Sequence, residues 1–260
     1  MQQEFNSPWE RIFFALLFDF SLFNIYNSIM LIKIDFIEIP NSKIKPKGTK
    51  ELFSFWNKTA KFYIEQRVKH YSEVFIKGTN EAIFAELAFC IFTPQSKALS
   101  CWKAINILND KNLLFSASAQ EISKNISNVR FQNNKANFLV QAREKFTSNG
   151  KLNIKQVLKS FDNPINLRKW IIDNIKGIGY KEAGHFLRNI GLGLDLAILD
   201  RHILRNLKFY NAIEEIPSTL TPKIYLDTEQ KMINFCKNIK IPMSHMDLLM
   251  WAMQTGGIFK

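Results

Sequence analysis

The chain has 260 residues, of which 47% are hydrophobic, and carries a formal net charge of +12 with an isoelectric point near 9.5. It is long enough to bury a substantial core, as one large domain or as two small ones. Residues 1–49 contain five basic and five acidic side chains, so the whole positive excess lies in the rest of the chain. Such an excess favours a polyanionic partner such as nucleic acid, although a lysine-rich bias of the source proteome explains it equally well.

The three cysteines, Cys90, Cys101 and Cys236, are odd in number and far apart in the sequence. No two of them have the spacing of a zinc site or an iron–sulfur cluster, so no metal or other cofactor is predicted. Cys90 lies in an apolar run. We interpret all three as reduced, mostly buried thiols of a cytoplasmic protein, and not as catalytic nucleophiles.

The first apolar stretch begins at Trp9 and ends at Pro40. It resembles a membrane segment in hydropathy, but Asp19 and two asparagines interrupt it near its middle, where a charge is costly. It also lacks the basic start and the small-residue cleavage site of a signal peptide. We expect a packed helix here, or a segment upstream of a start at Met30, in preference to a membrane span. Strand-like alternation occurs only in LIKIDFIEI, residues 31–39.

The segment PNSKIKPKGTK, residues 40–50, separates this stretch from the rest of the chain. Its two prolines, one glycine and four lysines are typical of an exposed loop or linker. We therefore divide the chain into an N-terminal extension with a linker, residues 1–49, and one domain, residues 50–260.

Apolar residues at helical spacing predict helices throughout this domain. Thr79 and Asn80 are placed to begin the first of them and Pro94 to end it. The predicted helices cover residues 81–92, 96–108, 116–126, 133–146 and 165–175, a stretch after Gly179, and residues 201–210, 221–239 and 244–253. We expect an all-α fold of short helices with short connections.

The stretch INLRKWIIDNIKGIGYKEAGHFLRNIG, residues 165–191, predicts two helices joined by a tight turn. Gly177 and Gly179 permit the positive φ and the close approach that a sharp turn requires, and Ile178 between them is expected to point into the core. The backbone N–H groups of such a turn suit a DNA phosphate, whatever the base sequence. From the turn alone, a purely structural hairpin remains the alternative.

Two chemically useful side chains follow this turn. Asp200 comes after an apolar stretch and before a predicted helix, which makes it a helix N-cap whose carboxylate is held by backbone N–H groups. Lys181 lies nineteen residues earlier, and the two are expected to converge across the second helix and its return loop. An exposed lysine is protonated at neutral pH and cannot attack, whereas partial desolvation by aromatic side chains would free the amine.

At these positions the chain resembles the helix-hairpin-helix DNA glycosylases. KGIGYKEAGHFLRNIG (176–191) and LAILDRHILR (196–205) are similar to their hairpin and aspartate, although the loop at 191–197 has glycines and no proline. FCIFTPQS (89–96), VRFQNNKANFLVQAR (129–143) and WAMQTGGIFK (251–260) are most similar to the compact, archaeal-type family of 8-oxoguanine DNA glycosylase/AP lyases, also found in some bacteria. The resemblance covers roughly residues 50–260 and implies two helical subdomains with the active site in the cleft between them.

The resemblance implies a role for each of the two side chains. Lys181 is similar to the lysine of the bifunctional members, which attacks C1′ of the damaged nucleotide, forms a Schiff base as the purine leaves, and allows β-elimination to break the strand 3′ to the lesion. Asp200 would stabilise the positive charge that develops on the sugar and help to position or deprotonate the lysine.

The resemblance further implies that Trp251 and the C-terminal Lys260 recognise the extruded base. A carboxylate at Lys260 could accept a hydrogen bond from the N7–H group that 8-oxoguanine has and guanine lacks. Gln95 is a candidate to fill the space vacated in the duplex, although Pro94 to Ser96 could equally well only break one helix and cap the next.

Five further residues are candidates for contacts with the base or the DNA, and each has an alternative interpretation. Phe92 and Phe131 are candidates for lining the base pocket, but in a chain with 23 phenylalanines the core is the stronger interpretation. His202 could orient Asp200 or touch a phosphate, or be a buried, hydrogen-bonded histidine. Arg130 and Lys135 are candidate phosphate contacts, as solvated basic residues are anywhere on a basic face.

The predicted partner is double-stranded DNA that contains 8-oxoguanine, bound by a monomer, because no heptad or symmetric patch stands out. The cysteines do not fit the iron–sulfur members of the superfamily, and Lys181 disfavours the monofunctional ones. The alternative function is a non-catalytic helix-hairpin-helix module that anchors a partner to DNA. It accounts for the charge and the glycines, but gives no reason for Asp200 or for the segment from Trp251 to Lys260.

Overall fold

The computed structural model describes residues 36–42 and 46–260. The predictions for the apolar N-terminal stretch and for a start at Met30 concern residues outside these ranges. Among the residues that are described, no helix combines the length and the apolar character needed to cross a bilayer. The fold is mostly helical, as predicted, and its helices surround two separate clusters of buried apolar side chains.

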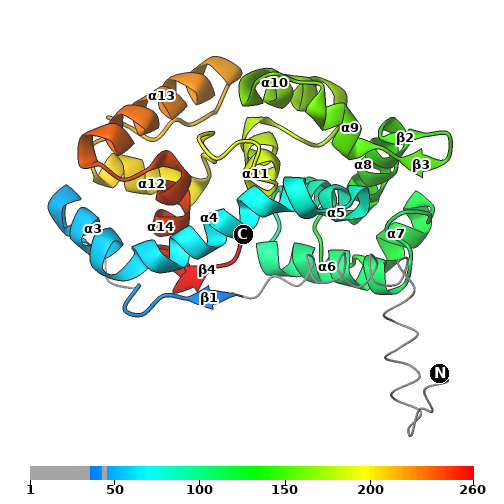
Figure 1. The fold of residues 1–260 in the computed structure, drawn as a ribbon, viewed down its shortest axis with the longest axis horizontal. Helices are drawn as coiled ribbons and strands as arrows, with labels where there is room; N and C mark the ends of the chain where they lie inside the picture. The colour runs from blue at the N-terminus through cyan, green and yellow to red at the C-terminus, as the bar shows by residue number, and fades with distance from the viewer. Residues whose placement is uncertain (1–35, 43–45) are drawn as a thin grey trace, which may run out of the picture.

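The first cluster lies within a group of helices that we call the first lobe (Figure 1). Its central helix is buried along its whole length from Ala82 to Phe92, since nearly every residue there is apolar. Thr79 caps the start of this helix by accepting a hydrogen bond from the Ala82 N–H group, as predicted. The lobe comprises α5 (Asn80–Phe92), α6 (Ala98–Asp110), α7 (Ala119–Asn125), α8 (Gln132–Lys145), α9 (Ile154–Lys159), α10 (Pro164–Asn174) and α11 (Tyr180–Asn189), with a small hairpin of β2 (Thr147–Ser148) and β3 (Lys151–Leu152).

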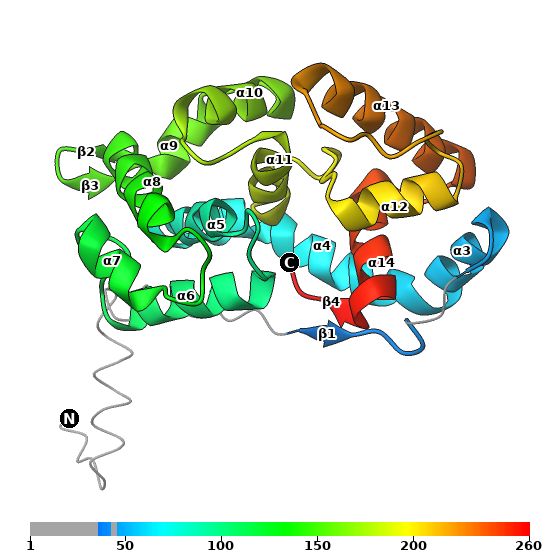
Figure 2. The same ribbon diagram turned by 180° about the vertical axis from the view of Figure 1, so that it is seen from behind.

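The second cluster lies among the remaining helices, which form the second lobe. Its longest members are an 18-residue and a 17-residue helix, and the 17-residue helix, α4, extends across both lobes in Figures 1 and 2. The lobe comprises α3 (Thr49–Phe55), a π-helical turn η1 (Trp56–Ala60), α4 (Lys61–Lys77), α12 (Arg201–Phe209), α13 (Pro222–Ile239) and α14 (Met243–Thr255).

A two-stranded antiparallel ladder joins the start of the described chain to its C-terminal tail. β1 (Ile37–Glu38) pairs with β4 (Gly257–Ile258), and Ile37 lies opposite Ile258. Gly257 is required because a Cβ atom there would lie 2.3 Å from the carbonyl oxygen of Ile37. β1 falls within the alternating stretch 31–39. The C-terminus comes to lie near the middle of the molecule, where the two lobes meet (Figure 2).

Candidate active site

The predicted helical hairpin is formed by α10, a turn and α11. Gly177 has a φ of +81°, and a Cβ atom there would lie 2.5 Å from the ring of Phe138, so both its conformation and its close packing require glycine. Ile178 is buried, as predicted. The expectation of a positive φ at Gly179 was wrong, because this residue is extended, with φ −104° and ψ −168°. Both glycines are exposed at the start of α11, where the N–H group of Gly179 donates a hydrogen bond of 3.3 Å to Oε2 of Glu182.

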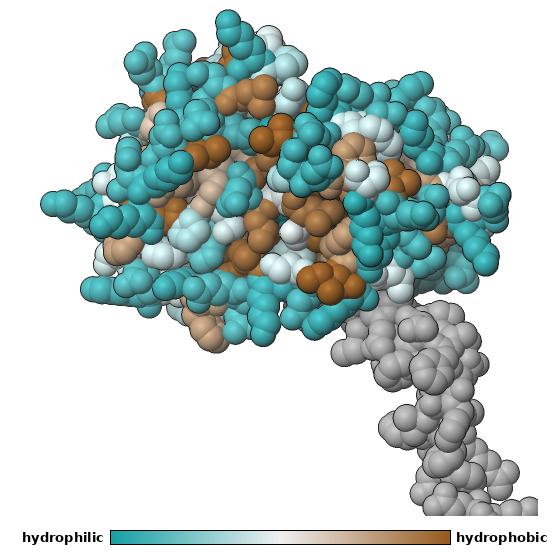
Figure 3. All heavy atoms as spheres, turned by 45° about the horizontal axis from the view of Figure 1, so that its top comes forward, coloured by the Kyte–Doolittle hydropathy of each residue, from teal (hydrophilic) through white to brown (hydrophobic). Residues whose placement is uncertain are grey.

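A hollow of about 380 Å³ lies between the lobes, and we call it the central hollow. From the first lobe, the loop after α5 and three residues of α11 line it, and Lys181 is one of the three. From the second lobe come Ile198, residues 200–203 and three residues of α14 that include Trp251. Lys260 completes the wall. Figure 3 shows polar side chains over most of one face of the molecule, with apolar ones gathered toward its middle.

Lys181 and Asp200 both line the central hollow. The Lys181 side chain is 25% exposed, and its Nζ atom lies 3.6 Å from Oε1 of Glu182. Asp200 caps α12 as predicted, because its Oδ1 atom accepts hydrogen bonds of 2.8 Å from the N–H groups of His202 and Ile203. These two bonds fix the carboxylate, and both are accepted by Oδ1 and not by Oδ2. A partly accessible amine and a fixed carboxylate therefore share one cavity.

Trp251 is half-buried on the wall of the central hollow. The ring of His202 meets the indole edge-on, with ring centroids 5.5 Å apart. His202 therefore contributes to the site in two ways, through its backbone N–H bond to Asp200 and through this ring contact. Such a contact fixes the plane of the indole, as a platform for a flat ligand requires.

Lys260 is anchored from behind the hollow. Its side chain is fully buried, its Nζ atom pairs with Oε1 of Glu86, and this ammonium group lies 3.4 Å from the centre of the Trp102 ring. The other oxygen of Glu86 accepts a hydrogen bond from Asn189 Nδ2 on α11. Burial lowers the pKa of Lys260 to about 8, while Glu86 opposes that change. Since the whole residue is 6% exposed, its exposed part belongs to the main chain.

Comparison of the chain with known proteins identifies its family. Residues 64–241 match the family model described as 8-oxoguanine DNA glycosylase with a helix-hairpin-helix motif. The chain is 46% identical over 212 residues to the 8-oxoguanine DNA glycosylase/AP lyase of Fusobacterium nucleatum, which covers 79% of this chain and 98% of that relative. The chain belongs to the 8-oxoguanine DNA glycosylase family.

Solved structures of this 8-oxoguanine DNA glycosylase family share the fold. The enzyme of Methanocaldococcus jannaschii superposes with a TM-score of 0.73 at 35% identity, over 82% of this chain and 95% of that one. The same enzyme has been solved in complex with a 15mer DNA containing 8-oxoguanine, and that structure also superposes with a TM-score of 0.73. The enzyme of Thermotoga maritima gives 0.71 at 32% identity, over 82% and 98% of the two chains.

Phe92 and Phe131 were candidates for the base pocket, with the core as the stronger interpretation, and neither lines the central hollow. Phe92 is completely buried in the first lobe, where its carbonyl oxygen accepts hydrogen bonds from Lys135 and Cys101. Phe131 is 54% exposed, beside Arg130, so the core interpretation was wrong for this residue. The direction of the Phe131 side chain could not be predicted from sequence spacing, because this residue adopts a left-handed conformation that turns the chain just before α8.

Lys135 also differs from its prediction. It was expected to be a solvated phosphate contact, but it is only 4% exposed and donates hydrogen bonds to the loop after α5. Arg130 is exposed, as the predicted phosphate contact requires. Gln95 is exposed at the rim of the central hollow in a left-handed conformation, with a φ of +56°.

The sequence did not single out His185, Arg188 or Asp247, which also line the hollow of this glycosylase. His185 and Arg188 follow Lys181 by four and seven positions, so helical periodicity places all three on one face of α11. Asp247 precedes Trp251 by four positions on α14 and pairs with Arg188 at 3.4 Å. The i, i+4 and i, i+7 spacings of a helix face would have found each of them once Lys181 and Trp251 were chosen.

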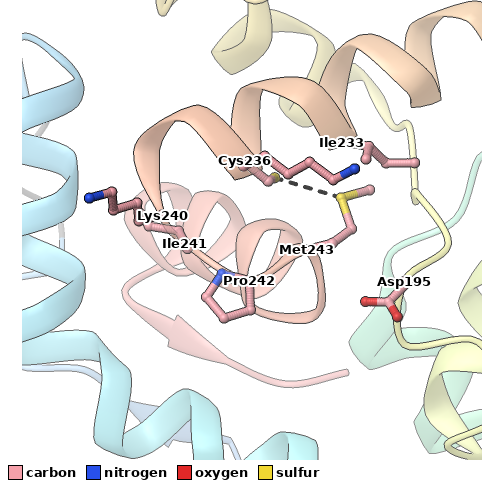
Figure 4. Close-up of a pocket in the computed structure, with 8 residues that line it drawn as sticks. Asp195, Ile233, Cys236, Lys240, Ile241, Pro242 and Met243 are labelled. Carbon is pink, nitrogen blue, oxygen red and sulfur yellow. Dashed lines mark hydrogen bonds between the residues drawn. The ribbon is translucent and has the colours of Figure 1, made fainter.

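The three cysteines are free and buried, as predicted. Burial raises the pKa of the Cys101 thiol to about 11 and that of the Cys236 thiol to about 12, so the nucleophilic thiolate is scarce at both. Cys236 contacts the sulfur of Met243 at 3.6 Å in a second hollow, of about 550 Å³, between the end of α13 and the start of α14 (Figure 4). Neither Lys181 nor Asp200 lines this second hollow.

Proposed function

We propose that the protein is a bifunctional 8-oxoguanine DNA glycosylase/AP lyase of base excision repair, with Lys181 as its Schiff-base nucleophile. The Lys181 amine would attack C1′, and the C1′–N9 bond would break with its electron pair and a proton going to the departing purine. Ring opening would leave an imine between Lys181 and the sugar. Loss of a proton from C2′ would then expel the 3′-phosphate by β-elimination.

The observation that carries this proposal is that Lys181 of α11 and Asp200 at the start of α12 both line the central hollow, which Trp251 also lines. Two other lysines line the same hollow, Lys97 and Lys260. The Lys260 amine is fully buried and paired with Glu86, so it is not free to attack. Lys97 is exposed to solvent on the loop after α5, whereas the Lys181 side chain is only 25% exposed. These contrasts favour Lys181 over either neighbour.

Asp200 would act by electrostatics. Departure of the base leaves positive charge on the sugar ring, and a carboxylate held rigid by two N–H donors needs no rearrangement to stabilise it. The same carboxylate, through Oδ2, is available to hold or accept a proton of the attacking amine. The N-cap bonds and the catalytic role are therefore compatible.

Base recognition would take place in the same hollow, at Trp251 and Lys260. An extruded purine would stack on Trp251, whose plane the His202 ring supports. Lys260 would contact the edge of the base through its main chain, since its side chain is locked behind the wall. Gln95, at the rim, would enter the space left in the duplex.

The partner would be duplex DNA containing 8-oxoguanine, bound by a monomer through residues 50–260. The excess of positive charge in this part of the chain supplies attraction that is independent of base sequence. The exposed glycines of the hairpin turn would approach one phosphate, and Arg130 would offer its guanidinium to another.

The test of this function is incision of a duplex that carries a single 8-oxoguanine. The protein should cut the lesion strand without added alkali, at the lesion and not at a guanine in the same place. Binding of the duplex without incision would favour the alternative, a DNA-anchoring module. An abasic site in place of the lesion separates the two activities, since strand cleavage there needs no base recognition.

Glu86→Gln is expected to weaken excision of 8-oxoguanine while incision of an abasic site persists. Removing one partner of a buried ion pair costs about 3–5 kcal/mol, and here it leaves the Lys260 ammonium without its carboxylate. Lys260 would then no longer be held in its position on the wall of the central hollow. Single-turnover rates on both substrates measure the effect, and Glu73→Gln, which removes an exposed carboxylate paired with Lys77, is the matched control. Equal losses on both substrates would contradict the assignment.

A further inference from the structure

Lys135 lies close to two exposed residues of the first lobe, Phe131 just before α8 and Gln95 at the rim of the central hollow, which Phe131 does not line. It belongs to the first turn of α8, four positions after Phe131, and its Nζ atom reaches the loop that follows α5. That loop carries Gln95. Phe131 and Gln95 both have positive φ values, +59° and +56°, which side chains other than glycine rarely adopt.

The Lys135 ammonium group has no hydrogen left for a phosphate. Its three donors meet three acceptors: the carbonyl oxygens of Phe92 at 2.6 Å and Pro94 at 2.7 Å, and Oγ of Ser96 at 3.1 Å. The residue is 4% exposed. Because all three N–H groups of this buried ammonium are used within the protein, Lys135 has a structural role and is not the solvated phosphate contact expected from the sequence.

These bonds hold one specific loop. Phe92 is the last residue of α5, so its carbonyl is one of those left without a helical partner, and a cation there also suits the negative end of the helix. Ser96 accepts a further hydrogen bond of 3.0 Å from the N–H group of Arg130. Hydrogen bonds from Lys135 and Arg130 therefore join the loop of residues 92–96 to the start of α8 and the turn before it. Gln95 lies between the bonded residues Pro94 and Ser96.

We propose that Lys135 is a positioning residue that holds Gln95 at the rim of the central hollow, in the conformation in which its side chain enters the duplex. The inference rests on the proposed function, because it gives Gln95 the task of filling the vacated space. A left-handed residue in a short loop persists only when its surroundings hold it there. Lys135 supplies those surroundings through contacts on both sides of Gln95.

A double-mutant cycle tests the proposal. Lys135→Met keeps the buried hydrocarbon stem and removes the three donors, and Gln95→Ala removes the side chain that they are proposed to position. We expect Lys135→Met to lower single-turnover excision from duplex DNA by on the order of ten- to hundredfold, as a small misplacement can. In the Gln95→Ala background, Lys135→Met should cause little further loss. Incision of an abasic site in single-stranded DNA should survive in all four proteins, because nothing has to be extruded from a duplex.

The salt dependence of duplex binding distinguishes positioning from phosphate contact. Each phosphate contact contributes roughly 0.9 to the slope of log K against log salt, so Lys135→Met should leave that slope unchanged. The exposed Lys103→Met is the control for the loss of one positive charge. If Lys135→Met does not fold, Ser96→Ala removes one of its three acceptors and should reproduce a smaller loss.

Three results would overturn the proposal: a slope that falls by about one in Lys135→Met, independent losses that multiply in the double variant, or full excision by Lys135→Met. A wild-type protein that fails to incise 8-oxoguanine DNA would instead contradict the proposed function, so the two failures are distinguishable.

Discussion

Lys181→Gln is expected to abolish both base excision and strand cleavage, while duplex binding stays close to that of the wild type. Glutamine keeps a polar side chain on α11 but has no amine that can attack C1′ or form an imine. Replacing a nucleophile in other enzymes costs at least on the order of a thousandfold in rate. Single-turnover incision of an 8-oxoguanine duplex and of an abasic duplex measures the two activities, and a gel-shift titration measures binding.

Lys176→Gln provides the matched control for this variant. Lys176 is an exposed lysine in the hairpin turn, five positions before Lys181. Its replacement removes the same charge from the same motif, and we expect at most a loss of affinity that added salt diminishes. Normal strand cleavage by Lys181→Gln would rule out its role as the nucleophile.

Asp200→Asn is expected to reduce excision by on the order of 10²–10³, with little change in the free energy of unfolding. Asparagine caps a helix about as well as aspartate, so the bonds from the N–H groups of His202 and Ile203 can persist. The negative charge opposite the developing positive sugar would be lost. Single-turnover rates and urea denaturation, measured on the same preparation, separate the two effects.

Two further variants sharpen the Asp200 experiment. Asp200→Ala should lose stability by about 1 kcal/mol as well as activity, because it removes the cap. Asp195→Asn neutralises a carboxylate that lines the second hollow and not the central one, and it should leave excision unchanged. Wild-type excision by Asp200→Asn would exclude an electrostatic role for the carboxylate.

Local sequence signals predicted the scaffold of the site well. Thr79 and Asp200 are small or acidic residues directly before apolar helical stretches, and both cap the helices that follow them. Gly177 marks a turn in which any side chain would be strained by the positive φ and would displace the neighbouring Phe138 ring. These features depend on residues close together in the chain, which is why the sequence indicates them.

The direction of individual side chains was harder to predict. Lys135 shares one buried face of α8 with Leu139 and Ala142, at the i, i+4 and i+7 positions. Its charge predicted that the side chain would be exposed to solvent. It is buried because three hydrogen-bond acceptors are supplied by a loop some forty residues earlier in the chain, which no local pattern indicates. The pairing of Lys260 with Glu86 joins residues 174 positions apart, and no local pattern predicts it.

The central claim is that Lys181 forms the covalent intermediate, and borohydride trapping tests it most directly. Borohydride reduces an imine to a stable amine, so an 8-oxoguanine duplex incubated with the protein should become covalently attached. Digestion and mass spectrometry of the adduct would then locate the modified lysine. The account predicts attachment at Lys181, and none for Lys181→Gln. Attachment at Lys97 or Lys260, or incision without any trapped complex, would contradict it.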